Sequence, residues 1–245
     1  MGAEGSFRVE SNRPVAEGIY RMELSGDASA FRASGQFANF AVEGAYLRRP
    51  LSASDYHAGG FAVIYKVVGD GTRRLSGRRA GDALNALVGL GNGFDDTVGE
   101  RPILLGGGMG AAPLYALAKA LLKRGARPAA ILGFSRAAEV ICAEELSALG
   151  VPASAYTLDG SAGRRGLVTE GLDPEAGDAL YACGPEAMLR AACDRWPGDA
   201  QLSFEARMGC GFGACMGCGR KTLGGMKRIC KDGPVLWKSE VAWEG

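Results

Sequence analysis

Hydrophobic and polar positions change their pattern twice along this chain. Up to about residue 98, short apolar or alternating runs are separated by turns rich in glycine, aspartate and serine. Such runs predict strands, here Phe7–Glu10, Ile19–Leu24, Phe37–Val42 and Phe61–Val68. Turns are expected at Ser25–Asp27, at Gly69–Gly71 and around the single histidine, His57. Short strands joined by such turns predict a small antiparallel β-barrel for residues 1–98.

Residues 99–200 follow a different rhythm, in which buried strands alternate with segments of helical period. The predicted strands are Pro102–Leu105, Ala129–Gly133, Ala153–Leu158 and Ala179–Cys183, and the predicted helices are Ala111–Lys123, Ala137–Leu149 and Pro185–Arg195. This alternation predicts a parallel sheet in a Rossmann-like α/β domain. Residues 201–245 follow neither pattern and are expected to form a small C-terminal module, so the predicted fold class is a β-barrel plus α/β.

The C-terminal module carries four cysteines, Cys210, Cys215, Cys218 and Cys230, in the spacing C-x4-C-x2-C-x11-C. Three thiolates in one short loop and a fourth further along form the ligand set of a plant-type [2Fe–2S] cluster. Glycines between them let the loop bend tightly and turn backbone N–H groups toward the sulfurs. The pattern predicts an iron–sulfur site, and a one-electron cluster implies a second redox cofactor elsewhere in the chain.

Two other interpretations of these cysteines stay open. Structural zinc usually takes two separated pairs of ligands, whereas here three of the four crowd into one loop. Disulfides need an oxidising compartment, and no apolar signal segment opens the chain. We therefore expect reduced thiols in the cytoplasm. Cys142 and Cys193 are scattered and are expected to be small buried residues.

Composition narrows the function further. The chain has 245 residues, 47% of them hydrophobic, which is enough for two domains with sizeable cores. The net charge of +1 argues against bulk attraction to nucleic acid or a membrane surface, and no apolar run reaches the length of a membrane span. The 39 glycines point to many tight turns and close approaches to cofactors.

A glycine-rich turn follows the first predicted strand of the α/β region and opens its first helix. It contains Gly106, Gly107, Gly108 and Gly110. Backbone amides at such a helix start can hold a diphosphate, although strand–helix packing alone can also require glycine. Cys183, Gly184 and Pro185 stand at the carboxyl end of a later strand, where ligands of open α/β sheets bind. They are expected near the mouth of the same cleft, unless Cys183 merely completes the core.

Arg49-Pro50-Leu51-Ser52 resembles the flavin motif of the ferredoxin–NADP reductase superfamily, and the glycine turn and Cys183-Gly184-Pro185 fit the nucleotide domain of that superfamily. With the cysteine module added, roughly residues 7–243 resemble the electron-transfer subunits of class 1B dihydroorotate dehydrogenases. Supporting stretches are Gly35–Phe37, Leu90–Phe94, Met208–Gly211 and Cys230–Val235.

The resemblance implies roles for residues of the barrel. Arg49 is expected to pair with the diphosphate of FAD, because a guanidinium fork matches phosphate oxygens, and Ser52 to face N5 of the isoalloxazine. The remaining flavin contacts that it implies are Pro50, Leu51, Ile64, Tyr65, Lys66, Gly71 and Thr72. Taken singly, Arg48 and Arg49 could be a solvated basic pair and Tyr65 a half-buried strand residue.

The resemblance also implies a function. Electrons are expected to pass from an FMN-containing dihydroorotate dehydrogenase catalytic subunit through the [2Fe–2S] cluster to FAD and on to NAD+, in a heterotetramer serving pyrimidine biosynthesis. Arg136 follows the second α/β strand and could reach an adenosine 2′-phosphate, so NADP stays open beside NAD. No acid–base set is evident, so no catalytic residue is assigned and the cofactors carry the chemistry of this oxidoreductase subunit.

Two rival functions remain. The first is a related ferredoxin- or hydrogenase-linked NAD(P)H reductase subunit, which shares all three regions. The second is a zinc-stabilised binding module without redox activity. The basic residues around the cysteines are either a docking face or an ordinary solvated surface; they are Arg207, Arg220, Lys221, Lys227, Arg228 and Lys231.

Overall fold

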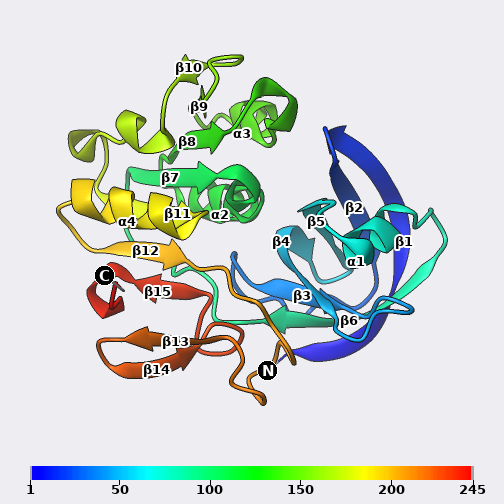
Figure 1. The fold of residues 1–245 in the computed structure, drawn as a ribbon. Helices are drawn as coiled ribbons and strands as arrows, with labels where there is room; N and C mark the ends of the chain where they lie inside the picture. Colours follow the sequence, from blue (N-terminus) through cyan, green and yellow to red (C-terminus); the bar gives the residue numbers. More distant parts are fainter. Residues whose placement is uncertain (1, 244–245) are drawn as a thin grey trace.

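The computed structural model describes residues 2–243, and its N-terminal part is a closed antiparallel barrel (Figure 1). The strands follow the order β1-β2-β5-β4-β3-β6 around the barrel. Their bounds are β1 Ala3–Ala16, β2 Ile19–Ser25, β3 Phe37–Phe40, β4 Arg49–His57, β5 Gly60–Lys66 and β6 Ala83–Leu90. Apolar side chains from every strand fill the interior, including Phe7, Met22, Phe40 and Tyr65, each no more than 1% exposed.

The middle part is a sheet of seven strands in the order β10-β9-β8-β7-β11-β12-β15, parallel except for the last. The bounds are β7 Pro102–Gly107, β8 Ala129–Phe134, β9 Ala153–Thr157, β10 Arg164–Arg165, β11 Ala179–Cys183 and β12 Ala200–Ser203. Helix α2 (Ala111–Arg124) buries Leu114, Leu117 and Leu121 against the sheet and ends at Gly125, whose φ of +90° closes the helix. Helices α3 (Ala143–Ala148) and α4 (Glu186–Arg195) also belong to this part, and they bury Leu146 and Leu189, respectively, in its apolar clusters.

The cysteine-bearing segment follows β12. It passes beside the barrel strand β3, forms the hairpin β13 (Gly219–Thr222) and β14 (Gly225–Arg228), and returns as β15 (Val235–Trp237). Because β15 pairs with β12, the end of the chain adds an antiparallel edge to the α/β sheet. Among residues 2–243, no helix is long and apolar enough to cross a membrane.

The predicted fold class is confirmed, with local corrections. Gly69–Gly71 was expected as a turn, but Asp70 begins helix α1 (Asp70–Ser76), whose start is closed by the Thr72 hydroxyl accepting from the N–H groups of Val68 and Gly69. The predicted helix Ala137–Leu149 is broken, because Cys142 has a φ of +64° and separates a short 3-10 turn from α3. The turn expected around His57 is present at Ala58 and Gly59, and His57 itself is the last residue of β4.

Candidate functional site: a pocket between barrel and sheet

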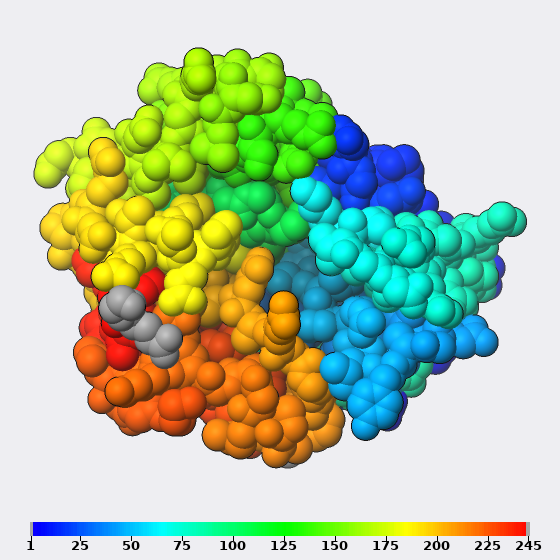
Figure 2. All heavy atoms as spheres, viewed as in Figure 1, coloured from blue at the N-terminus to red at the C-terminus, as the bar shows by residue number. Residues whose placement is uncertain are grey.

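Residues of the predicted flavin site and of the predicted nucleotide site line one cavity of about 360 Å³ between the barrel and the α/β sheet. Figure 2 shows the surface hollowed between barrel residues in blue, α/β residues in green and the segment after β12 in orange. Eight of the nine predicted flavin contacts line this cavity; they are Arg49, Pro50, Leu51, Ser52, Ile64, Tyr65, Lys66 and Thr72. Residues from separate strands therefore form one wall, as a cofactor site requires.

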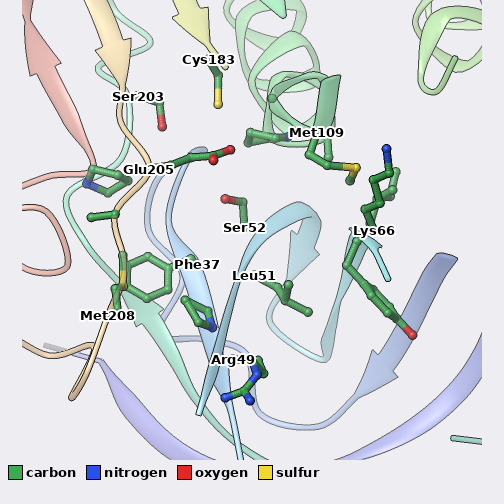
Figure 3. A pocket seen from close by; sticks show the side chains of 18 of the residues that line it. Phe37, Arg49, Leu51, Ser52, Lys66, Met109, Cys183, Ser203, Glu205 and Met208 are labelled. Carbon is green, nitrogen blue, oxygen red and sulfur yellow. The ribbon is translucent and has the colours of Figure 1, made fainter. Parts of the chain in front are cut away.

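Strand β4 carries the first of these residues. Ser52 points its hydroxyl into the middle of the cavity, and Arg49 lies at the lower end (Figure 3). The ninth predicted contact, Gly71, lies beneath Arg49, because a Cβ on Gly71 would come within 2.1 Å of Arg49 Nε. Glycine at this position lets the guanidinium lie against the start of α1, where a phosphate would find both Arg49 and the backbone of the first helical turn.

Strand β5 contributes Ile64, Tyr65 and Lys66. The Tyr65 hydroxyl donates to Asn12 Oδ1 at 3.0 Å, and burial raises the pKa of Tyr65 to about 12, so the ring enters the wall as a neutral phenol. Lys66 Nζ pairs with Glu139 Oε1 at 3.1 Å. This ion pair joins the barrel to the α/β part at the rim of the cavity.

The opposite wall comes from the carboxyl ends of the α/β strands. Cys183, Ser203 and Glu205 direct their polar ends toward Ser52 in Figure 3. Burial raises the pKa of the Cys183 thiol to about 12, so it stays protonated at neutral pH. Sequence reasoning missed Ser203 and Glu205, which carry no motif, and gave Met208 no role in the pocket although it begins a stretch that supports the resemblance. Ser203 ends the buried strand β12 and Glu205 follows it closely, which was the available signal, but β12 had not been predicted.

The glycine turn and Cys183-Gly184-Pro185 touch each other, as expected. Cys183 lies opposite Gly106 in the ladder between β11 and β7. A Cβ on Gly110 would come within 2.0 Å of the Cys183 carbonyl oxygen, and one on Gly184 within 3.0 Å of Gly107 Cα. Only residues without a Cβ allow this approach. The two motifs thus form one ridge at the carboxyl edge of the sheet.

A second cavity of about 380 Å³ lies beyond this ridge. Gly107, Gly108 and Pro185 line it, whereas Gly110 and Cys183 line the first cavity. The ridge therefore separates the two spaces by a single layer of residues. Glu139 also lines the second cavity, and it is the first acidic residue after β8.

Arg136 does not line either cavity. Its guanidinium pairs with Glu17 Oε1 at 3.1 Å and with Glu139 Oε1 at 3.6 Å. Glu17 precedes β2 of the barrel, so Arg136 is engaged in a second ionic contact between the barrel and the α/β part. Its role in recognising a nucleotide stays a prediction.

The four predicted ligand cysteines form two close pairs. Cys210 N–H donates to Cys215 Sγ and Cys215 N–H to Cys210 Sγ, both at 3.4 Å, and Cys230 N–H donates to Cys218 Sγ at 3.4 Å. Cys218 and Cys230 are buried, while Cys215 is exposed. In the described part of the chain, no three potential ligand side chains converge on one point closely enough to hold a metal ion.

The donor chemistry around the sulfurs fits thiolate ligands. Burial opposes ionisation of Cys210, but N–H donors from Cys215, Phe212 and Ala214 outweigh it and lower the pKa of the Cys210 thiol to about 6. Burial, together with the neighbouring Cys218, instead raises the pKa of Cys230 to about 12. Backbone N–H groups that converge on sulfur stabilise an anionic iron–sulfur centre, so these residues fit the cluster that the spacing predicts.

Comparison with known proteins gives matches for both of the later regions. Residues 205–242 match the iron–sulfur cluster binding domain of dihydroorotate dehydrogenase B, and residues 104–194 match the oxidoreductase NAD-binding domain. A chain from the solved structure of an NADH-dependent reduced ferredoxin-NADP oxidoreductase superimposes on this chain with a TM-score of 0.86 and 28% sequence identity. The match covers 99% of this chain and 92% of that one. Phthalate dioxygenase reductase shares the fold alone, with a TM-score of 0.66 and 16% identity over 90% of this chain and 87% of its own.

The barrel, the nucleotide sheet and the iron–sulfur segment together define a flavin- and NAD-dependent reductase of the ferredoxin–NADP reductase type. Curated relatives narrow this class. The dihydroorotate dehydrogenase B (NAD(+)) electron transfer subunit of Bacillus caldolyticus is 42% identical, covering 95% of this chain and 96% of its own, and that of Bacillus pumilus (strain SAFR-032) is 40% identical, covering 96% of each. The chain belongs to the family of dihydroorotate dehydrogenase B electron transfer subunits. The predicted family, fold class and set of cofactors are thus confirmed.

Proposed function

We propose that this chain carries electrons from a dihydroorotate-oxidising partner subunit to NAD+ in pyrimidine biosynthesis. The proposal rests on the proximity of three sites, which are the first cavity, the ridge of the nucleotide site and the cysteine loop. The first cavity borders the ridge of the nucleotide site, and its wall runs through Met208 into the loop that begins at Cys210. A bound [2Fe–2S] cluster would supply electrons one at a time, and a bound FAD would collect two of them together with a proton, so that a hydride could pass to NAD+.

The residues of the first cavity would hold FAD. Arg49 and the start of α1, with Gly71 and Thr72, would face its diphosphate, while Ser52 would donate to the reactive edge of the isoalloxazine. Cys183 and Glu205 would close the opposite side and exclude water. Because the Cys183 thiol is neutral, it adds no charge beside the isoalloxazine. Glycines Gly106, Gly107, Gly108 and Gly110, with Gly184 and Pro185, would shape the adjoining nucleotide site.

The nucleotide is proposed to be NAD+. Arg136 is already paired with two carboxylates, and Glu139 lines the second cavity, where a carboxylate suits ribose hydroxyls better than a 2′-phosphate. NADP+ is the alternative if Arg136 leaves Glu17. Cys210, Cys215, Cys218 and Cys230 would bind the cluster. Cluster thiolates need a reducing compartment, so the cytoplasm is the proposed location.

The partner is proposed to be an FMN-containing dihydroorotate dehydrogenase catalytic subunit, in a heterotetramer with two copies of each chain. Its docking face would lie around the exposed Cys215, where Phe212, Met216 and Met226 are each more than half exposed. Apolar side chains of this kind in a rim of Lys and Arg are typical of protein contacts. Electrons would then enter close to the cluster rather than through the barrel.

A second candidate rests on the TM-score of 0.86 to the NADH-dependent reduced ferredoxin-NADP oxidoreductase structure. In that case the chain would be a subunit of a bifurcating reductase. Affinity isolation of the chain from its native cells separates the two. A co-purified subunit that reduces NAD+ with dihydroorotate supports the first proposal. A complex that is inert with dihydroorotate and active with ferredoxin supports the second and contradicts the first.

A further inference from the structure

The side chain of Asn39 joins the barrel to the cysteine loop. Asn39 lies in β3 and is only 1% exposed. Its Nδ2 donates to the carbonyl oxygen of Cys210 at 3.2 Å, a contact between residues 171 positions apart in sequence. A buried amide that reaches across such a distance fixes one backbone segment on another.

The other half of this amide has no partner. Asn39 Oδ1 is buried without a hydrogen bond among the described residues. An unpaired buried acceptor destabilises a fold, and an apolar side chain of the same size would avoid that cost. Filling the barrel therefore does not account for an asparagine here. The NH2 group, which holds the Cys210 carbonyl, is the half of the side chain that does account for it.

The loop is shaped to receive this amide. Gly211 has a φ of +77°, and a Cβ on it would lie 2.2 Å from Asn39 Nδ2. The backbone that follows Cys210 thus rests directly on the side chain, in a conformation that glycine adopts at little cost. Asn39 and Gly211 are complementary parts of one contact.

This contact lies where the flavin pocket meets the cysteine loop. In the strand ladder Asn39 pairs with Pro50, which lines the first cavity, and Phe37 on the same strand lines it too. Met208 lines the cavity from the side of the loop, two residues before Cys210. Between Met208 and Cys210 stands only Gly209, whose backbone is easily reoriented. The covalent link alone would leave the loop free to move relative to the pocket.

We propose that Asn39 is a positioning residue for electron transfer, which clamps the Cys210 carbonyl and fixes the separation between the flavin pocket and the cluster loop. The inference rests on the proposed function, because it concerns the path between FAD and the cluster. The rate of electron tunnelling falls exponentially with distance, so a small displacement of the loop lowers the rate strongly. Asn39 touches neither cofactor in this account and acts through the position of Cys210.

The test compares two variants in the full-length chain, prepared anaerobically with FAD and iron. Asn39→Leu removes the donor and keeps the side chain's size, whereas Asn39→Ser avoids overpacking but is too short to reach the carbonyl. Asn85→Leu is the control for the strand contact alone, because Asn85 is an exposed asparagine of neighbouring β6 that accepts from Arg48, which also donates to the Asn39 backbone carbonyl, and has no bond to the loop. Rapid mixing with NADH follows reduction of the flavin and then of the cluster, and hydrogen exchange follows the amides of residues 209–215.

In both Asn39 variants we expect flavin reduction at the wild-type rate, cluster reduction slowed about tenfold or more, and faster exchange confined to the loop. The control should match wild type in all three. Wild-type cluster reduction and loop exchange in both variants would overturn the proposal, as would slower cluster reduction explained by lost FAD or an unfolded barrel. If the proposed function itself fails, wild-type protein will not pass electrons from NADH to the cluster, while loop exchange still decides whether Asn39 is a clamp.

Discussion

The wall of the first cavity, which is the proposed flavin pocket, and the cysteine loop of residues 209–218 lie next to each other but differ in how their backbones are held. The wall consists of β3, β4 and β5, whose backbone groups are paired in ladders; the side chains of β3 and β5 are largely buried, and those of β4 are mostly half-buried. The loop from Gly209 to Cys218 contains no strand, and its backbone N–H groups point at sulfur atoms. Gly211, Gly213 and Met216 take left-handed conformations there.

The two sites therefore differ in the interactions that stabilise their folded structure. The barrel buries its own apolar core, so we expect it to fold without help from a cofactor. The loop buries little, and its shape depends on the bonds that its thiols make together with a few side-chain contacts to its carbonyl groups, from Asn39 to Cys210 and from Arg228 to Gly213. We therefore expect damage to the loop to leave the flavin pocket intact, whereas damage to the pocket or to the ridge alters nucleotide chemistry and leaves the cluster in place.

The largest expected effect is that of Cys230→Ser. Loss of one thiolate ligand should abolish the cluster and, with it, electron transfer from the partner subunit. FAD content and NADH-driven reduction of an artificial acceptor should persist, because Cys230 is not part of the first cavity. Iron and acid-labile sulfide analysis, with Cys193→Ser as control, checks this. An unchanged iron content in Cys230→Ser would contradict the ligand assignment.

Arg49→Lys should weaken FAD binding on the order of 10- to 100-fold, since a single ammonium replaces a guanidinium fork. Fluorescence titration of the FAD-free protein measures the dissociation constant. Arg48→Lys is the control for FAD binding, because Arg48 does not line the cavity and bonds instead to Glu4, Asn85 and the backbone carbonyl of Asn39. Equal affinities for FAD in the two variants would remove Arg49 from the site, while the cluster should be unaffected in both.

Gly110→Ala tests the ridge between the two cavities. The new methyl group would meet the Cys183 carbonyl at 2.0 Å, so the turn at Gly108–Gly110 must move away from the end of β11. We expect a loss of about 1–3 kcal/mol in the free energy of unfolding and a raised KM for the nucleotide. Gly224→Ala serves as control, since nothing lies within 4 Å of its added Cβ. If Gly110→Ala has the stability and the KM of the wild type, the backbone at the ridge accommodates the methyl group without strain and the prediction is wrong.

The smallest expected effect concerns Glu186, at the start of α4 beside the ridge. Its carboxylate accepts two bonds from Arg220, at 2.6 and 3.0 Å, and this pairing lowers the pKa of Glu186. Because the carboxyl pKa is lowered in the folded protein, the ionised Glu186 contributes its full share to the free energy of unfolding at neutral pH. This contribution is lost as the pH falls below the ordinary pKa of 4.5.

Glu186→Gln should therefore cost only about 0.2–1 kcal/mol of stability at neutral pH, because the carboxylate is half exposed, and nothing at low pH. Denaturant unfolding at both pH values measures the difference. A cost that persists in acid would show that the charge of Glu186 is not what Arg220 recognises.

Sequence patterns predicted the parts of this molecule that have a period or a motif. The alternation of strands and helices gave the sheet, and the two glycine-containing motifs meet as expected because carboxyl ends of parallel strands share one edge. The helix α1 was missed since Asp70-Gly71 has the composition of a turn, and only Thr72 closing the helix start reveals it. Ser203 and Glu205 were missed because β12 was not predicted, and Asn39 could not be predicted, because its role arises from a contact between distant segments.

The most direct test of electron transfer between the flavin and the cluster is an anaerobic titration with NADH of the isolated chain that carries both FAD and the [2Fe–2S] cluster. Absorption and paramagnetic resonance spectra would follow flavin and cluster in the same sample. The account predicts that NADH reduces both, and that Cys230→Ser protein reduces its flavin alone. A flavin that NADH reduces while an intact cluster stays oxidised in the wild-type chain would contradict the account.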